Sequence, residues 1–140
     1  MNEPSAVEII WDKLPTKRDL SGQLDRLALP ADAKVLMGQL LNTTAEVAGK
    51  VVEVGRRILA FVIELVRRFP NTAFGALVGV VLTFLVGSIP LLGLVLGPLL
   101  GPILLAFSIG SGALADIKNS TIDRQIEQFS GKLDAALTQR

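Results

Sequence analysis

The chain has 140 residues, half of them hydrophobic, and its formal net charge at pH 7 is only +1. It contains no cysteine and no histidine, which excludes disulfide bonds, thiol chemistry and the metal sites that these two residues most often build. The small net charge also argues against a strongly basic protein, so we expect no nucleic-acid partner.

Residues 1–30 are expected to form two short amphipathic helices. Ser5 and Thr16 each precede an acidic residue by three positions, which is the spacing of a helix N-terminal cap, and a proline ends each helix. Trp11 is the only tryptophan, and we expect it either at a membrane–water interface or packed against the second helix. The first residues lack a long apolar run, so no cleaved leader is expected.

Residues 31–69 contain no proline, and one set of mostly apolar side chains recurs there every three or four positions. This periodicity predicts one long amphipathic helix. Acidic residues precede basic ones by four positions on its outer surface, as in Glu46–Lys50. The repeating positions are Leu40, Thr44, Val47, Val51, Val54, Ile58, Phe61, Leu65 and Phe69.

Two arginine pairs, Arg56–Arg57 and Arg67–Arg68, precede the most apolar part of the chain. Positively charged residues near a membrane crossing are retained on the cytoplasmic side, so the pairs predict that the N-terminal arm lies there. Their role is either to set this topology alone or also to contact anionic lipid headgroups.

Residues 69–115 form a stretch of 47 residues without Asp, Glu, Lys or Arg. One helical crossing of a hydrocarbon layer takes roughly 20 residues, so the stretch has room for two crossings and a turn. We therefore predict a transmembrane hairpin over residues 70–115, with crossings at about 71–86 and 91–115. The alternative is a buried core hairpin of a helical protein, but 140 residues are few to cover such a stretch on all sides.

The turn of the hairpin is predicted at Gly87 to Pro90, where glycine and proline occur together. The second crossing is then the longer one, and Pro98 and Pro102 would kink it. An alternative places the turn at 97–102. The proline spacing resembles the proline knot of oleosins, and a charge-free hairpin between amphipathic helices resembles the pore-forming domain of colicins; both resemblances are confined to the apolar stretch and imply no function.

Residues 116–140 are predicted to form a C-terminal amphipathic helix. An even number of crossings places both arms on the same side of the membrane. The predicted fold is thus an all-α membrane protein, a long antiparallel helical hairpin with two crossings at its tip, amphipathic cytoplasmic arms and short N-terminal helices. The apolar stripe of the C-terminal arm consists of Ile117, Ile122, Ile126, Phe129, Leu133 and Leu137.

Glycines recur at spacing four within the apolar stretch. Small residues at this spacing allow helix backbones to approach closely in a membrane, which predicts helix packing within the hairpin or between copies of the chain. These glycines are Gly75, Gly79, Gly93, Gly97 and Gly101.

No candidate catalytic group or phosphate-binding loop emerges, so we expect a protein that is not an enzyme and that has no cofactor and no metal. The leading hypothesis is an integral protein of the cytoplasmic (inner) membrane, with both termini cytoplasmic. There it would self-associate into a homo-oligomeric, membrane-perturbing or pore-like assembly of the holin, toxin or defence-effector type, with the lipid bilayer as its partner. The alternatives are an anchor that tethers a cytoplasmic protein partner and a hairpin that shapes the membrane.

Overall fold

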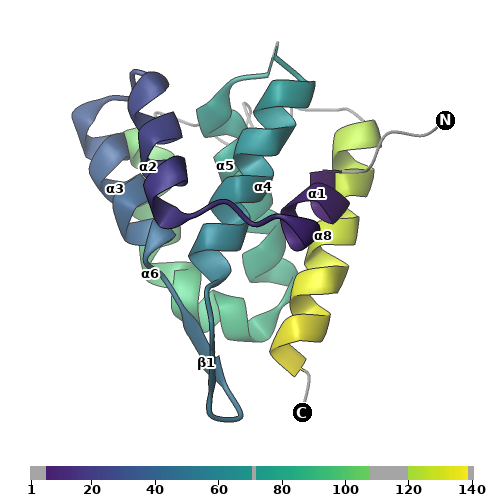
Figure 1. Cartoon of the computed structure of the whole chain (residues 1–140). Helices are drawn as coiled ribbons and strands as arrows, with labels where there is room; N and C mark the ends of the chain where they lie inside the picture. Colours follow the sequence, from purple (N-terminus) through teal and green to yellow (C-terminus); the bar gives the residue numbers. More distant parts are fainter. Residues whose placement is uncertain (1–5, 71, 108–119, 139–140) are drawn as a thin grey trace, which may run out of the picture.

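The computed structural model describes residues 6–70, 72–107 and 120–138. In this part of the chain, helices surround one central helix, and a small β-hairpin projects from the bundle (Figure 1). The elements are α1 (Ala6–Asp12), α2 (Lys17–Arg26), α3 (Ala31–Leu41), β1 (Ala45–Val47), β2 (Lys50–Val52), α4 (Val54–Arg68), α5 (Phe74–Ser88), α6 (Pro90–Ala106) and α8 (Ser120–Thr138).

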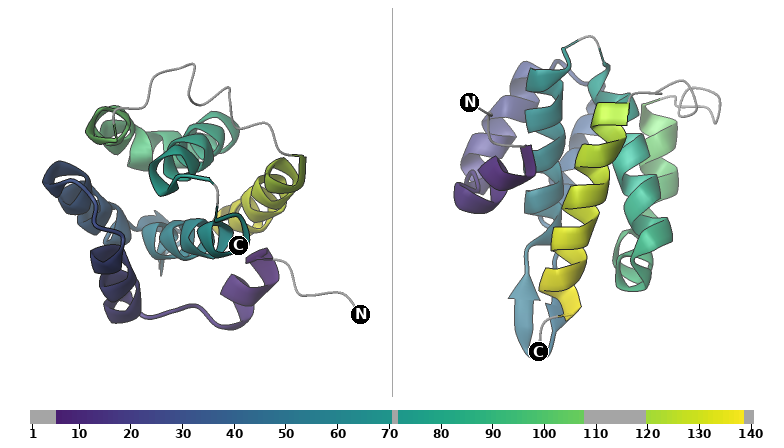
Figure 2. Two further views of the ribbon diagram at one scale, coloured as in Figure 1. Left: turned by 90° about the horizontal axis from the view of Figure 1, so that it is seen from above. Right: turned by 90° about the vertical axis from the view of Figure 1, so that its right-hand side faces the viewer.

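The central helix is α4, of which nine of the 15 residues are buried. Seen from above, α1, α2 and α3 lie on one side of α4, α5 and α6 on the other, and α8 at its edge (Figure 2). Of these, α1, α2, α3, α5 and α8 contact α4 directly. A helix that is covered in this way brings its neighbours to one shared core, and the burial of each large side chain contributes about 1.5–3 kcal/mol.

The structure differs from the single helix predicted over residues 31–69. Helix α3 ends at Leu41, and β1 and β2 pair antiparallel before α4 begins at Val54. The two turn residues, Ala48 and Gly49, have φ values of +52° and +80°, the left-handed conformation that a two-residue hairpin turn requires. A helix cannot continue through these two residues, so the run of apolar side chains is divided between strands and helix.

The predicted transmembrane hairpin is wrong. Helices α5 and α6 do form a hairpin, but they have only 15 and 17 residues, and among the described residues no helix has the length and apolar character needed to cross a bilayer. At 1.5 Å per residue they reach about 22 and 26 Å, against a hydrocarbon layer of about 30 Å. The all-α membrane fold and the location within the cytoplasmic membrane are therefore not supported.

Two features explain why the apolar stretch folds in this way. Helix α5 packs between α6 and the wide apolar side of α4, whose charged residues lie near its ends. Among the described residues, neighbours cover α6 on one side only, so the chain does not need to surround every apolar residue. The transmembrane prediction required every apolar residue of the stretch to be covered by protein or lipid, and the exposed side of α6 does not meet this requirement.

The chain reverses between α5 and α6 at Ile89, inside the predicted turn from Gly87 to Pro90. The alternative turn at 97–102 falls within α6, which continues past Pro98 and Pro102 as one helix. The predicted second crossing extended to residue 115, whereas α6 ends at Ala106; residues 108–119 lie outside the described part.

Helix α8 packs its predicted apolar stripe against the bundle, alongside α4 and α5 (Figure 2, right). The anchor of this contact is Phe129, whose ring stacks on Phe61 of α4 with centroids 4.3 Å apart. Trp11 of α1 meets the same ring edge-on at 5.7 Å, so it packs against α8 and not against α2. Of the predicted stripe, Ile117 lies outside the described residues; the buried members are Ile122, Ile126, Phe129, Leu133 and Leu137.

Candidate functional site

The most unusual surface of the molecule is the outer face of α6, here called the α6 face. Leu94 and Leu105 are 80% and 82% exposed, although a leucine in a helical bundle is normally buried. They are 11 positions apart, about three helical turns, and therefore lie on the same side of the helix. The exposed residues that define the α6 face are Leu94, Gly97, Pro98, Gly101, Pro102 and Leu105.

A groove of about 430 Å³ runs beside the α6 face, between α6 and α3. Its α6 wall includes Pro102 and Leu105, and its α3 wall includes Val35, which is 61% exposed. Of the residues that the structure describes, Asp32 is the one charged residue that lines it. The groove thus extends the apolar surface from α6 onto α3.

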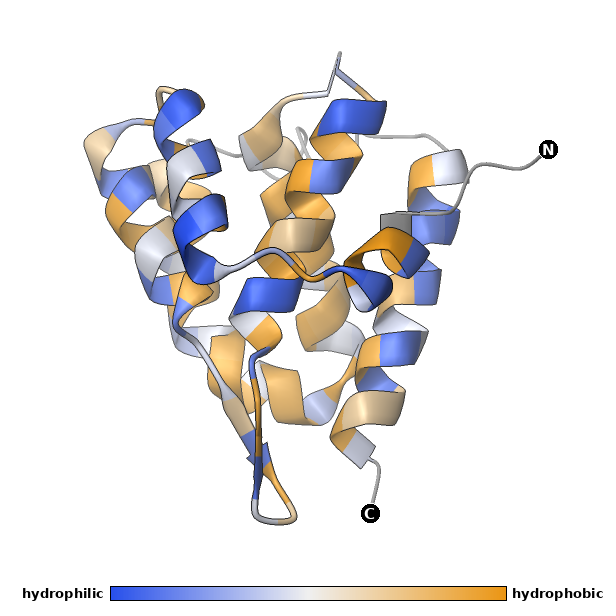
Figure 3. Ribbon diagram, in the orientation of Figure 1, coloured by the Kyte–Doolittle hydropathy of each residue, from blue (hydrophilic) through white to orange (hydrophobic). Residues whose placement is uncertain are grey.

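Helices α5 and α6 carry no charge. Residues 72–107, which make up α5 and α6, contain no charged side chain. Coloured by hydropathy, α5 and α6 are apolar almost throughout, whereas hydrophilic residues (blue) recur along α2 and α8 and at the ends of α4 (Figure 3). A partner of the α6 face therefore cannot be selected by opposite charge on α6 itself.

The five predicted packing glycines separate into two groups. Gly75 lies against Phe107, where an added Cβ would come within 2.5 Å of the phenylalanine ring, and Gly79 is buried. A Cβ at Gly93 would lie 3.5 Å from the Val86 carbonyl oxygen. These three glycines face neighbouring parts of the same chain.

Gly97 and Gly101 differ from the other three, because an added Cβ at either position would meet no atom within 4 Å. Both are exposed on the α6 face. The close approach that they permit is therefore not used within the described part of the chain.

The two arginine pairs that were predicted at a membrane surface lie at opposite ends of α4. Eleven residues separate Arg56 from Arg67, which is about 16 Å along the helix. The structure therefore does not bring the four guanidinium groups together into one basic belt.

Arg56 of α4 binds the linker between α1 and α2 through hydrogen bonds. Its Nε donates to the carbonyl oxygen of Pro15 at 2.7 Å, and its Nη2 donates to that of Leu14 at 3.3 Å. Its Nη1 also donates to Oε2 of Glu53 at 2.8 Å, and this hydrogen bond lowers the pKa of Glu53 below its usual value. The role seen for Arg56 is structural.

Arg57 lies over the ring of Trp11, with its Cζ 4.5 Å from the ring centroid. Burial lowers the pKa of this guanidinium, and its Nη1 has no hydrogen-bond partner among the described residues. A cation over an indole face is stabilised by about 0.5–2 kcal/mol. Arg57 thus joins α4 to α1.

At the other end of α4, Arg68 pairs with Glu64 at 3.2 Å. Arg67 reaches the same carboxylate only at 3.7 Å, and its side chain is 72% exposed. Of the four predicted arginines, Arg67 is thus the one most accessible to a ligand.

Replacing Arg56 by methionine is expected to lower the free energy of unfolding by about 2 kcal/mol, because the three hydrogen bonds that its charged guanidinium group donates are lost. Urea denaturation followed by circular dichroism measures the change. The matched control is Arg67→Met, which removes one long, exposed ion pair and should change stability by less than about 0.5 kcal/mol. Equal effects of the two substitutions would show that Arg56 does not fasten the linker.

The exposed residues Val35, Leu94 and Leu105 were not singled out by sequence reasoning. Helix α6 is apolar on all sides, so its sequence has no polar stripe that would mark which side faces outward. The eleven-residue spacing of the two leucines was a usable signal only once the neighbours of α6 were known.

Comparison with known proteins gives no relative. No protein-family model matches the chain, and neither a curated protein nor a solved structure matches it significantly.

Proposed function

We propose that the chain is a non-enzymatic helical protein that works by binding a second copy of itself through the α6 face. The observation that carries this proposal is the exposure of Leu94 and Leu105 on a helix that has no charged residue. Contiguous apolar patches on a protein surface commonly mark interaction sites, because leaving them in water is unfavourable.

A second copy is the partner that fits this face best. Two-fold symmetric dimers join the same patch on both subunits, so a patch must be complementary to itself. An uncharged patch meets this condition without electrostatic repulsion. The open positions at Gly97 and Gly101 would let two α6 helices approach closely at their crossing point.

The available area sets the strength of the association. Helix α6 is about 25 Å long and, with its side chains, about 10–12 Å across, so the α6 face itself offers roughly 250–300 Å² per copy. Standard interfaces bury about 800 Å² per partner, and smaller ones are weak and transient. The proposed dimer is therefore reversible and depends on concentration.

The composition supports a role without catalysis. The chain lacks histidine and cysteine, and the described residues contain no group of three or more acidic side chains placed to hold a metal ion. The carboxylates of Asp25, Glu53 and Glu64 pair with basic residues and are not grouped in a shielded cleft.

The pore and anchor functions predicted from the sequence need a hairpin that crosses a membrane, and the membrane-shaping function needs a hairpin that inserts into one. Because this fold is wrong for the described residues, only the part of the hypothesis that does not need it, self-association, is retained here.

Sedimentation equilibrium of the purified protein across about 1–500 µM tests the proposal. We expect reversible dimer formation, and we expect Leu105→Lys to weaken it at least about 100-fold, because each of the two copies loses a buried leucine worth about 1.5–3 kcal/mol. The matched control is Val51→Lys, which changes a 63% exposed residue of the β-hairpin and should leave the dissociation constant unchanged.

A chain that stays monomeric at every concentration overturns the proposal. So does a dimer that Leu105→Lys and Val51→Lys affect equally. Binding of the monomer to phospholipid vesicles through Leu105, without self-association, would also contradict it and would assign the α6 face to a lipid surface.

A further inference from the structure

A second site lies away from the α6 face, in a cleft of about 820 Å³ between α2, the linker before it and the last turn of α4. We call it the basic cleft, because among the described residues four cationic side chains line it against a single carboxylate, that of Asp19. The cationic residues are Lys13, Arg18, Arg26 and Arg67.

These cations are largely uncompensated. Among the residues that the structure describes, Lys13, Arg18 and Arg26 form no ion pair, and Arg67 has only the 3.7 Å contact with Glu64. The rest of the chain has ten Lys and Arg residues against twelve Asp and Glu residues, because the whole chain has 14 and 13. The basic cleft therefore concentrates positive potential in one place.

The backbone of α2 keeps the basic cleft open. Arg18, Gly22 and Arg26 follow at intervals of four residues and so line one side of the helix. An added Cβ at Gly22 would meet no atom within 4 Å. A glycine between two arginines thus leaves room for a ligand between their side chains.

The basic cleft adjoins a smaller apolar recess of about 190 Å³, whose apolar lining residues are Leu27, Ile63, Val66 and Phe74. An apolar cavity of about 150 Å³ in another protein is large enough to hold benzene. The recess can therefore receive a small ring or a short alkyl chain.

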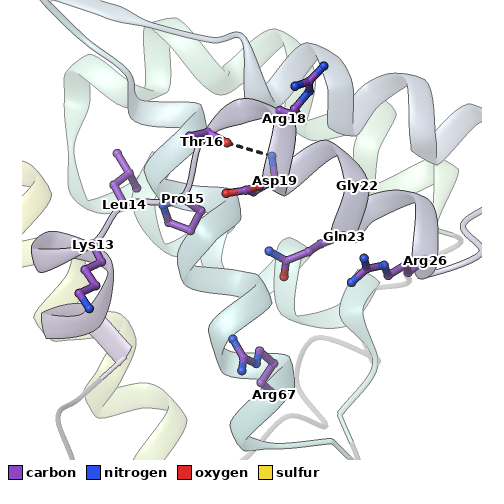
Figure 4. Close-up of a pocket in the computed structure, with 10 residues that line it drawn as sticks. All are labelled: Lys13, Leu14, Pro15, Thr16, Arg18, Asp19, Gly22, Gln23, Arg26 and Arg67. Carbon is purple, nitrogen blue, oxygen red and sulfur yellow. Dashed lines mark hydrogen bonds between the residues drawn. The ribbon is translucent and has the colours of Figure 1, made fainter.

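Three residues line both the basic cleft and the recess: Gln23, Arg26 and Arg67. Figure 4 shows that Gln23 and Arg26 come from α2 and Arg67 from α4, with their polar ends in the space between the two helices. Guanidinium groups bind carboxylate and phosphate oxygens through paired hydrogen bonds. These three polar side chains therefore lie where the charged head of an amphipathic ligand would meet its apolar part.

We propose that the basic cleft and the recess together bind a small amphipathic anion. Its carboxylate or phosphate head contacts Arg26 and Arg67, and its short apolar group fills the recess beside Val66 and Phe74. This site uses none of the residues of the α6 face and is independent of dimer formation.

Amide chemical-shift mapping and isothermal titration calorimetry of the full chain test the proposal, with octanoate and octyl phosphate as probes below their micelle-forming concentrations. Both are expected to shift amide signals of α2 and of the last turns of α4 in a saturable way. Octan-1-ol and inorganic phosphate, which each supply only half of the required chemistry, are expected to bind at least about tenfold more weakly, as for the loss of one charge-assisted hydrogen bond or of two buried methylene groups.

Arg26→Met is expected to weaken binding of the anionic probes at least about tenfold. The matched control is Arg124→Met, which removes the same charge from the exposed surface of α8 and should leave affinity unchanged. Thermal melting of both variants establishes that they are folded to the same extent.

The probes also separate the two sources of the anionic head. Binding of octanoate alone assigns the site to carboxylates, binding of octyl phosphate alone assigns it to phosphate esters, and either result supports the proposal. It is overturned if octan-1-ol binds as tightly as the anions, if Arg26→Met and Arg124→Met bind them equally, or if the shifted amides belong to α6.

Discussion

Replacing Gly55 by alanine is expected to lower the free energy of unfolding by at least about 3 kcal/mol, the upper range for overpacking a close contact. Gly55 lies in the first turn of α4, where this helix passes the end of α3. Its N–H donates to the Thr43 carbonyl oxygen at 3.0 Å. A Cβ there would overlap the Leu40 carbonyl oxygen and lie 2.8 Å from the Leu40 carbonyl carbon. These are backbone atoms, so no side chain can turn away to relieve the contact.

The matched control for Gly55→Ala is Gly38→Ala in the neighbouring helix α3, where an added Cβ meets nothing within 4 Å. Because alanine is favoured over glycine inside a helix, this substitution should be neutral or should stabilise by up to about 1 kcal/mol. Urea denaturation measures both variants. If Gly55→Ala unfolds at the same urea concentration as the parent, α4 does not approach α3 as closely as the structure shows.

Phe129→Ala is expected to lower the free energy of unfolding by about 3–5 kcal/mol, the usual cost of removing a fully buried aromatic side chain. The ring of Phe129 is completely buried, stacks on Phe61 and receives the edge of Trp11. Its removal leaves a cavity where α1, α4 and α8 meet, so the expected effect extends beyond α8.

Gln128→Ala is the control for Phe129→Ala, since Gln128 is the exposed preceding residue of α8 and should contribute less than about 0.5 kcal/mol. Near-ultraviolet circular dichroism adds a second measurement, because Trp11 loses its aromatic neighbour in Phe129→Ala alone. A loss of α8 protection in hydrogen exchange with an unchanged signal from Trp11 would contradict the three-helix contact.

Local signals in the sequence predicted the buried sides of α2 and α8 well. Thr16 caps α2 by accepting a hydrogen bond from the Asp19 N–H at 3.1 Å, and Leu20 and Leu24 form the buried side of this helix. The stripe of α8 is buried at the predicted spacing. In both helices one side is apolar and the other is charged, so periodicity alone identifies the buried side.

The β-hairpin was missed because Val47 and Val51 fit a helical repeat as well as a pair of strands. Two features decide between the readings: the register that places Val47 opposite Lys50, and the left-handed conformation at Ala48 and Gly49. A glycine between two short runs rich in valine was the available signal, and a three-to-four residue repeat across it concealed the turn.

The error over the apolar stretch has a different cause. An absence of charge shows that a segment avoids water, but it does not show whether lipid or protein replaces the water. Here α5 is covered by the apolar side of α4, an amphipathic helix, and this pairing could not be derived from the composition of either segment. For the same reason the candidate sites were only partly foreseen: Gly97, Gly101 and Arg67 were named, whereas the surfaces to which they belong depend on tertiary packing.

The central position of α4 in space matches its position in the chain. Residues 54–68 lie in the middle of 140, so α3 and α5, its neighbours in sequence, can pack on it after closing only short connections. The entropy lost on closing a loop grows with loop length. A central helix in the middle of the chain is separated from the helices that pack on it by fewer residues than a central helix at either terminus would be. The contacts of α3 and α5 with α4 are therefore made between neighbours in sequence, and contacts of this kind favour rapid folding.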